Sequence, residues 1–232
     1  MQTVILAGGL GTRLGSLTKT IPKPMVTVRG VPYLEHQFRL LAKQKLTRVL
    51  VLSGYLGDHI EQHFGDGRRL GLQIRYSRET HPLGTGGALR AAEPWLDDLF
   101  LILYGDSYLP IEYRNVSDRL AASSALGVIA VYRDASGETS VPANVALDDD
   151  GYITKYDKQR SGAPGLDYIE AGVLAFRRSV IGLISPARSV SLESDIYPQL
   201  IARRALIGML TSVRFWDIGT PQRLREIEEF LT

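Results

Sequence analysis

The first 106 residues alternate short apolar runs with longer amphipathic stretches, and this alternation limits the fold more than any other feature. The apolar runs are TVILA (3–7), RVLVLSG (48–54), LQIRYS (72–77) and DLFLILYGD (98–106). Between them, apolar residues recur at helical spacing over 33–45, 56–64 and 86–92. Strands separated by helices of this length connect by right-handed crossovers. We therefore expect a mostly parallel sheet covered by helices on both faces.

After residue 106 the pattern becomes rich in strands. Strand-like runs occupy 125–133, 144–148, 152–157 and 166–177, with the hairpin-turn sequence DDDG at 148–151. A helix is expected over 191–204, then a strand-like run over 209–217 and a closing helix over 221–231. The predicted fold class is α/β: a Rossmann-like, mostly parallel mixed sheet flanked by helices, with a strand-rich second half. No linker divides residues 1–232, so we expect a single domain.

Composition excludes several classes of function. The formal net charge is only +2, which gives no electrostatic reason to expect a nucleic-acid partner. The absence of cysteine rules out disulfides, thiol nucleophiles and thiolate metal sites. Neither a signal peptide nor an apolar run approaching the ~20 residues of a membrane span is visible. We expect a cytoplasmic protein without membrane contact, and leave open whether it forms a homo-oligomer.

A glycine-rich segment follows the first apolar run, and three kinds of phosphate-binding loop compete for it. The sequence GGLGTR lacks the lysine that a P-loop requires after its last glycine. A dinucleotide fingerprint needs a third glycine where Leu14 stands, and an acidic residue that the second strand lacks. The remaining candidate wraps a triphosphate with backbone N–H groups, while Arg13 neutralises charge on the outer phosphates.

The combination of this loop with a later P-K-P motif resembles the sugar-phosphate nucleotidyltransferases. Gly8–Leu14 reads GGLGTRL, and Pro22-Lys23-Pro24 follows about ten residues later, as in that family. The resemblance continues along nearly the whole chain. It includes the second glycine segment HPLGTGGA (81–88), Gly105-Asp106 at the end of the fourth apolar run, Tyr156-Asp157-Lys158, and Asp217 in FWDIGTP.

The resemblance implies a nucleotide-binding half over 1–110 and a sugar-phosphate-binding half over 111–232. The expected nucleotide-binding residues are Leu6, Ala7, Gly8, Gly9, Gly11, Thr12, Arg13, Gly84, Thr85, Gly86 and Asp106. The expected sugar-phosphate-binding residues are Asn144, Lys158, Glu170 and Gly172. Arg13 and Lys23 are the expected catalytic residues, with Arg13 on the departing pyrophosphate and Lys23 between the two reacting phosphates.

The implied reaction is the formation of an NDP-sugar and pyrophosphate from an NTP and a sugar 1-phosphate. The attacking phosphate oxygen is already anionic, so catalysis needs positioning and charge neutralisation rather than a general base. Asp106 and Asp217 each follow an apolar run, which places both carboxylates at the edge of the sheet where ligands bind. Two carboxylates with phosphate oxygens and waters suit Mg²⁺, the expected cofactor.

Substrate identity is less constrained than reaction class. PLGTGGAL, SLESDIYP and WDIGTP resemble the guanylyltransferases of heptose 1-phosphates, which favours GTP and a heptose or hexose 1-phosphate. The segment Ile169-Glu170-Ala171-Gly172 stands where many relatives have an asparagine or glycine before the last glycine, and Asp157 replaces a commoner glutamate, so the sugar stays open. The alternatives are uridylyl or cytidylyl transfer to another sugar 1-phosphate, and a non-catalytic nucleotide-sensing subunit on the same fold.

Overall fold

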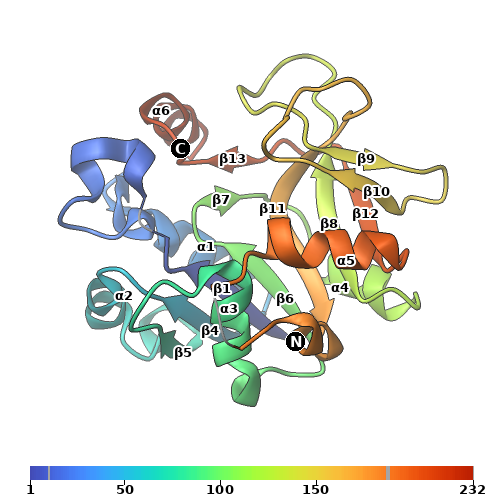
Figure 1. The fold of residues 1–232 in the computed structure, drawn as a ribbon. Helices are drawn as coiled ribbons and strands as arrows, with labels where there is room; N and C mark the ends of the chain where they lie inside the picture. The colour runs from blue at the N-terminus through green and yellow to red at the C-terminus, as the bar shows by residue number, and fades with distance from the viewer. Residues whose placement is uncertain (10, 187–188, 232) are drawn as a thin grey trace.

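The computed structural model describes residues 1–9, 11–186 and 189–231, and it has a seven-stranded sheet at its centre (Figure 1). In spatial order the strands are β12 (Leu206–Thr211), β8 (Gly127–Tyr132), β11 (Ile169–Arg177), β6 (Leu99–Tyr104), β1 (Gln2–Ala7), β4 (Arg48–Ser53) and β5 (Gln73–Arg78). β11 runs antiparallel to both of its neighbours, and the other pairings are parallel. The prediction of a mostly parallel mixed sheet is confirmed.

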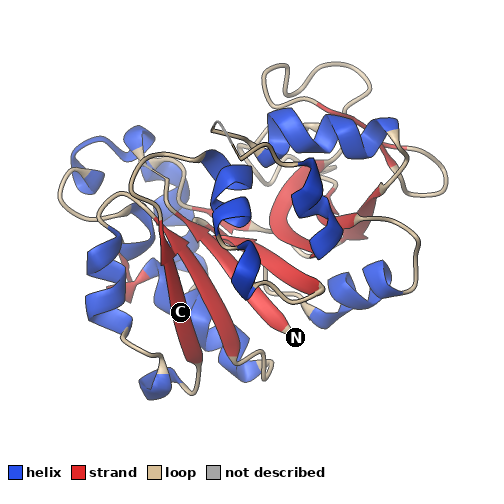
Figure 2. Cartoon of the chain, turned by 60° about the horizontal axis from the view of Figure 1, so that its bottom comes forward, coloured by secondary structure: helices blue, strands red, loops and turns tan. Residues whose placement is uncertain are grey.

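Helices cover both faces of this sheet, as the alternation of the sequence predicts (Figure 2). One face packs against α1 (Tyr33–Lys43), α2 (Gly57–Phe64) and α4 (Arg114–Ala121). The other packs against α3 (Gly84–Ala91), the 3-10 segment η5 (Arg178–Leu183) and α5 (Tyr197–Ala202). Side chains along β6 alternate between the two cores, Phe100 and Ile102 facing one and Leu101 and Leu103 the other. No helix among the described residues is long and apolar enough to cross a membrane.

The expected hairpin of the second half forms beside the sheet. β9 (Val145–Leu147) pairs antiparallel with β10 (Ile153–Tyr156) across the DDDG turn. Arg204 pairs with Asp148 at 3.0 Å and with Asp150, and its guanidinium lies 4.6 Å from the Tyr152 ring centroid. The acidic turn is thus tied to Arg204, just after α5.

Short elements lie beside the carboxyl edge of the sheet, after the glycine loop. The glycine loop leads into the 3-10 segments η1 (Thr12–Thr18) and η2 (Lys23–Met25), and then into the small pair β2 (Thr27–Val28) and β3 (Val31–Pro32). The last helix, α6 (Pro221–Phe230), packs on this region through a third apolar cluster that includes Leu14, Val26 and Ile227. Residues 12–32 and the last helix therefore lie side by side (Figure 1).

Two expected elements differ in detail. The helix expected over 191–204 begins at the predicted N-cap Ser191, but its first turn is a π-helical segment, η6 (Leu192–Ile196), that precedes α5. The run expected over 209–217 divides into the end of β12 and a separate strand, β13 (Trp216–Asp217), which pairs with β7 (Ser107–Tyr108). This division lets the chain turn from the edge of the large sheet back to the end of β6.

A bulge in β11 requires glycine at its centre. The register against β8 shifts between Glu170 and Leu174, and Gly172 in the shifted segment has φ +78°. A Cβ at Gly172 would lie 2.5 Å from the Cβ of Ser107, so β11 approaches β7 too closely for any side chain. The bulge bends β11 just after Glu170, where its regular pairing with β8 is interrupted. Bulges of this kind are common next to active sites.

Gly172→Ala should lower the free energy of unfolding by at least about 2 kcal/mol, since left-handed backbone and overpacking each cost roughly 1–2 kcal/mol. Urea denaturation measures this change. Gly182→Ala is the matched control, because its added Cβ meets no heavy atom within 4 Å outside its own helix. Equal losses in the two variants would contradict the assignment of strain to Gly172.

Candidate active site

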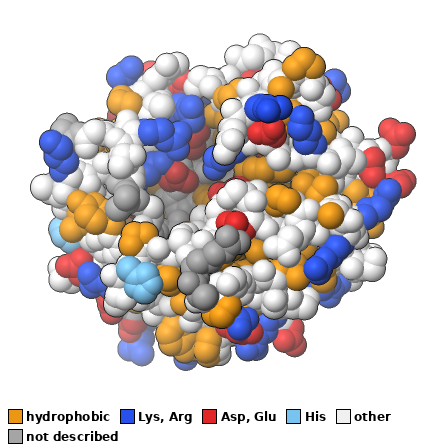
Figure 3. Space-filling model, in the orientation of Figure 1, with side chains coloured by type: hydrophobic (Ala, Val, Ile, Leu, Met, Phe, Trp, Pro, Cys, Tyr) orange, Lys and Arg blue, Asp and Glu red, His pale blue; other side chains and the backbone are white. Residues whose placement is uncertain are grey.

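A cavity of about 1200 Å³ lies at the carboxyl edge of the sheet. Its walls come from the segments that follow β1, β4, β5 and β6, from β11, and from the η6 and β13 regions. Charged side chains of both signs gather around a hollow near the middle of this face (Figure 3). Because parallel strands end at one edge, residues far apart in sequence converge here, as in other open α/β proteins.

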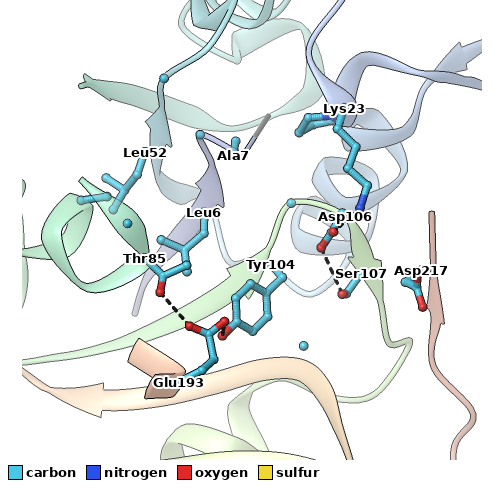
Figure 4. Close-up of a pocket in the computed structure, with 18 of the residues that line it drawn as sticks. Leu6, Ala7, Lys23, Leu52, Thr85, Tyr104, Asp106, Ser107, Glu193 and Asp217 are labelled. Carbon is cyan, nitrogen blue, oxygen red and sulfur yellow. Dashed lines mark hydrogen bonds and ion pairs between the residues drawn. The ribbon is translucent and has the colours of Figure 1, made fainter. Parts of the chain in front are cut away.

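The lysine of the P-K-P motif is buried and paired. Lys23 is only 8% exposed, and its Nζ forms an ion pair with Oδ2 of Asp106 at the end of β6 (Figure 4). Burial raises the pKa of Asp106, but Lys23, with smaller contributions from Lys158 and Arg13, outweighs burial and leaves that pKa lowered. Asp106 is therefore an ionised carboxylate at neutral pH, and Lys23 balances its charge.

The second predicted carboxylate lies next to the first through backbone pairing. In the β7–β13 pair Asp217 is opposite Ser107, and the Ile218 N–H donates to the Asp106 carbonyl at 3.0 Å. Arg223 Nη1 donates to both carboxylate oxygens of Asp217, at 3.1 and 2.9 Å. Thr220, not Asp217, caps α6. Asp217 Oδ1 also accepts from the Gly219 N–H at 2.5 Å, so its carboxylate is held by the segment that precedes α6 without capping the helix.

These two carboxylates fit the chemistry of Mg²⁺. Both donors are hard oxygens, and Mg²⁺ in phosphate-transferring sites commonly uses one or two carboxylates, completing its shell with water and substrate phosphates. Among the residues that the structure describes, no cluster of three or more His, Cys, Asp or Glu could hold a metal by itself. A metal held by these two carboxylates would need further ligands, such as water or substrate oxygens, to complete its shell.

The predicted sugar-side residues surround a second buried acid. Glu170 accepts hydrogen bonds from Tyr156 Oη at 2.6 Å and Tyr197 Oη at 3.0 Å, and its backbone N–H donates to Asn144 Oδ1 at 3.0 Å. Asn144 therefore fixes the backbone of Glu170. Burial, and then the nearby charge of Glu193, raise the pKa of Glu170 to about 7.

Three functional candidates escape the sequence analysis: Glu79, Tyr104 and Glu193, each of which lines the cavity. In the sequence Glu193 is typical of an acidic residue in the first turn of a helix. In the structure its side chain is only 12% exposed and pairs with Lys158 at 3.6 Å. Glu79 follows β5, and its Oε2 accepts from the Leu83 N–H at 3.1 Å. The position of Glu79 after a parallel strand is the one signal that could have identified it.

Most of the predicted site residues meet in the cavity. Those that line it are Leu6, Ala7, Gly8, Gly9, Arg13, Lys23, Gly84, Thr85, Asp106, Asn144, Lys158, Glu170, Gly172 and Asp217. Three predicted residues that the structure describes do not line the cavity: Gly11, Thr12 and Gly86. The Gly86 N–H donates to the Val190 carbonyl at 2.8 Å, so this donor is already used within the protein. Gly11 instead packs against the Lys23 side chain.

The fold and this cavity together define an α/β protein with a charged cavity at the carboxyl edge of its sheet. The chain belongs to the nucleotidyl transferase family, whose profile matches residues 2–232.

Similar proteins of this family come from several organisms. The chain is 32% identical over 225 residues to mannose-1-phosphate guanylyltransferase of Mycobacterium tuberculosis. The match covers 96% of this chain and 62% of that protein. It thus spans about 60% of that relative's length. It is 30% identical to D-glycero-alpha-D-manno-heptose 1-phosphate guanylyltransferase of Campylobacter jejuni, with 96% of each covered. The crystal structure of HddC from Yersinia pseudotuberculosis is 26% identical and superposes with a TM-score of 0.83, covering 100% of this chain and 99% of that one. Its complex with GMP-PN gives a TM-score of 0.81, with the same identity and coverage.

Glu170→Gln should stabilise the protein more at pH 8 than at pH 5. A carboxyl whose folded pKa is raised to about 7 keeps its proton at pH 5, where glutamine imitates it, and loses it at pH 8, where the buried charge destabilises the fold. The increase in unfolding free energy caused by Glu170→Gln should be larger at pH 8 than at pH 5, by on the order of 1–3 kcal/mol.

Urea denaturation of both proteins at both pH values measures this difference, because groups common to both proteins cancel. Glu229→Gln on the exposed surface of α6 serves as the control and should give no pH-dependent gain. A gain at pH 5 equal to that at pH 8 would contradict the raised pKa of Glu170.

Proposed function

We propose that the protein transfers the nucleotidyl group of an NTP to a sugar 1-phosphate, releasing pyrophosphate, with GTP and a heptose or hexose 1-phosphate as substrates. The observation that carries this proposal is that one cavity holds two separate cation–carboxylate pairs, Lys23 with Asp106 and Lys158 with Glu193. Its volume of about 1200 Å³ exceeds the ~300–1000 Å³ usual for a single small ligand. Two phosphorylated substrates can therefore lie in it together.

The proposed reaction is an in-line displacement. An oxygen of the sugar phosphate forms a bond to the α-phosphorus while the bond to the β-phosphate oxygen breaks, and pyrophosphate leaves. No proton needs to be removed, since the attacking oxygen is already ionised. Lys23 lies between the reacting phosphates, Arg13 holds the departing pyrophosphate and Lys158 holds the sugar phosphate. Each cation reduces the repulsion between two anions.

Asp106 and Asp217 are the residues that would hold Mg²⁺. When bound, the ion would stabilise negative charge on the transferring phosphate and orient it. Lys23 and Arg223 balance these carboxylates within the protein itself. Phosphate oxygens offer the Lys23 ammonium an alternative partner, so substrate binding can free Asp106 for the metal.

The acid after β5 favours guanine. Glu79 is half-buried in the cavity wall, and its Oε1 lies close to Gly8 and Gly54, 3.1 and 2.6 Å from where their Cβ atoms would stand. An ionised carboxylate only accepts hydrogen bonds. The base edge of guanine offers two adjacent N–H donors, whereas uracil offers one. The guanylyltransferase names of the two relatives described above and the GMP-PN complex of HddC support the same base, although another relative, from Synechocystis, is named as a uridylyltransferase.

The first test measures pyrophosphate released with Mg²⁺, each of the four NTPs, and a panel of heptose and hexose 1-phosphates. Activity with GTP is expected, and activity with UTP or CTP alone would support the uridylyl or cytidylyl alternative. No release with any pair would support the non-catalytic nucleotide-sensing alternative. Lys23→Ala and Asp106→Ala should each lower kcat on the order of 10²- to 10³-fold, as for other preorganised charge-stabilising groups. Lys43→Ala, an exposed lysine on α1, is the matched control.

Glu79→Gln tests the choice of base. The amide replaces one acceptor oxygen with a donor, so kcat/KM for GTP should fall at least about tenfold, the value of one lost hydrogen bond of about 1.4 kcal/mol. kcat/KM for UTP should fall less. Glu61→Gln, on the exposed face of α2, should change neither value. Equal losses for GTP and UTP would remove Glu79 from base recognition.

A further inference from the structure

The segment around Val190 is joined to the second glycine segment by a series of hydrogen bonds. The Val190 N–H donates to the Leu83 carbonyl at 2.8 Å, and the Val190 carbonyl accepts from Gly86 and Gly87 at 2.8 and 3.1 Å. Gly84 has φ +75°, and a Cβ there would lie 2.5 Å from the Val190 carbonyl oxygen. The two segments therefore form one unit, although about 100 residues separate them.

Thr85 connects this unit to an acid in the cavity. Its Oγ1 accepts from the Leu192 N–H at 2.8 Å and donates to Glu193 Oε2 at 2.8 Å. Figure 4 shows Thr85 and Tyr104 both directed toward Glu193. The Thr85 hydroxyl has one proton, and that proton is committed to Glu193. Thr85 is therefore placed to position Glu193 rather than to donate to a nucleotide.

Glu193 is a preorganised anion. Ser191 Oγ donates to its Oε2 at 2.8 Å, and Tyr104 Oη donates to its Oε1 at 3.0 Å. Burial raises the pKa of Glu193, but Lys158 and these hydrogen bonds outweigh it and leave that pKa lowered. A carboxylate with this many donors is ionised and fixed in orientation before substrate arrives.

A chain of tyrosine hydroxyls links Glu193 to Glu170. Tyr104 Oη, which donates to Glu193, lies 3.3 Å from Tyr197 Oη, which donates to Glu170 at 3.0 Å. Among the described residues, Lys158 is the cation that pairs with this group, and its side chain is 64% exposed. This end of the cavity thus carries two carboxylates and one solvated cation.

We propose that Glu193, positioned by Thr85, acts with Glu170 to select an uncharged sugar and to reject sugars that carry a carboxylate, such as uronic acid 1-phosphates. The inference rests on the proposed function. Glu193 is the ionised acid, and its Oε1 has one hydrogen-bond donor, Tyr104, besides Lys158, so this oxygen can accept from a sugar hydroxyl. A sugar carboxylate has no proton to donate to Glu193 Oε1 and would be repelled by it at short range. Lys158 cannot compensate, because it serves the sugar phosphate.

A purely structural role is the competing explanation, in which Thr85 and Ser191 simply cap the turn before α5. Capping needs the Ser191 hydroxyl, which accepts from the Ser194 N–H at 3.2 Å, but it does not need a carboxylate in the cavity wall. The two explanations predict different kinetics, because a cap changes stability whereas a selecting residue changes KM for one substrate.

The experiment measures kcat and KM of the wild type for GTP, for a neutral hexose 1-phosphate and for the matching uronic acid 1-phosphate. We expect kcat/KM for the uronate to be at least about 100-fold lower than for the neutral sugar, the effect of one buried like-charge contact of roughly 3 kcal/mol. A wild type that uses the uronate within threefold of the neutral sugar overturns the inference while leaving the transferase function intact. No turnover of any sugar 1-phosphate is instead a failure of the proposed function.

Three variants separate positioning from structure. Glu193→Gln should raise KM for the neutral sugar about tenfold, keep KM for GTP within twofold, and reduce the discrimination against the uronate about tenfold. Thr85→Val, which keeps the shape but removes the hydroxyl, should show the same pattern, and Thr85→Ser should restore wild-type values within threefold. Glu61→Gln is the surface control. A Thr85→Val variant that raises KM for GTP instead, or Glu193→Gln losses confined to unfolding free energy, would overturn the assignment.

Discussion

Parallel pairing of β1, β4, β5 and β6 is the constraint on which the rest of the molecule depends. The four strands end at Ala7, Ser53, Arg78 and Tyr104, and parallel register brings these ends to one edge. The glycine loop, Glu79 and Asp106 follow directly from three of those ends. The β7–β13 pair then returns the end of the chain to the same edge, which adds Asp217. Glu79, Asp106 and Asp217 acquire their places from this arrangement.

Charge balance is the second organising feature. Lys23 with Asp106, Arg223 with Asp217, and Lys158 with Glu193 form three ion pairs around one cavity. Cations placed in a cavity for phosphates would otherwise repel one another, and buried carboxylates would take up protons. Pairing keeps both kinds of group ionised before substrates bind.

The parts of the structure that depend on local segments can be predicted from the sequence. The alternation of apolar runs and helices predicts the sheet, and Lys23 and Asp106 lie where their motifs place them. Thr85 and Gly86 are harder to interpret, because their hydrogen bonds go to the segment around Val190, and nothing in the sequence signals that contact. Glu193 has the local pattern of a helix N-terminus, and its burial depends on Thr85 and Tyr104, which lie 108 and 89 residues away.

The same distinction explains why the reaction is easier to infer than the sugar. The residues predicted to bind phosphate lie on contiguous loops whose glycines and prolines constrain the backbone, so their sequence reflects their geometry. The second end of the cavity is assembled from the β9–β10 hairpin, the β11 bulge and η6, joined by side-chain hydrogen bonds among Tyr104, Tyr156, Tyr197, Glu170 and Glu193. Under the proposed function, a change at any one of these positions would alter the hydroxyls that the cavity can accept while leaving the phosphate chemistry intact. Substrate choice would then diverge within this fold without disturbing the reaction.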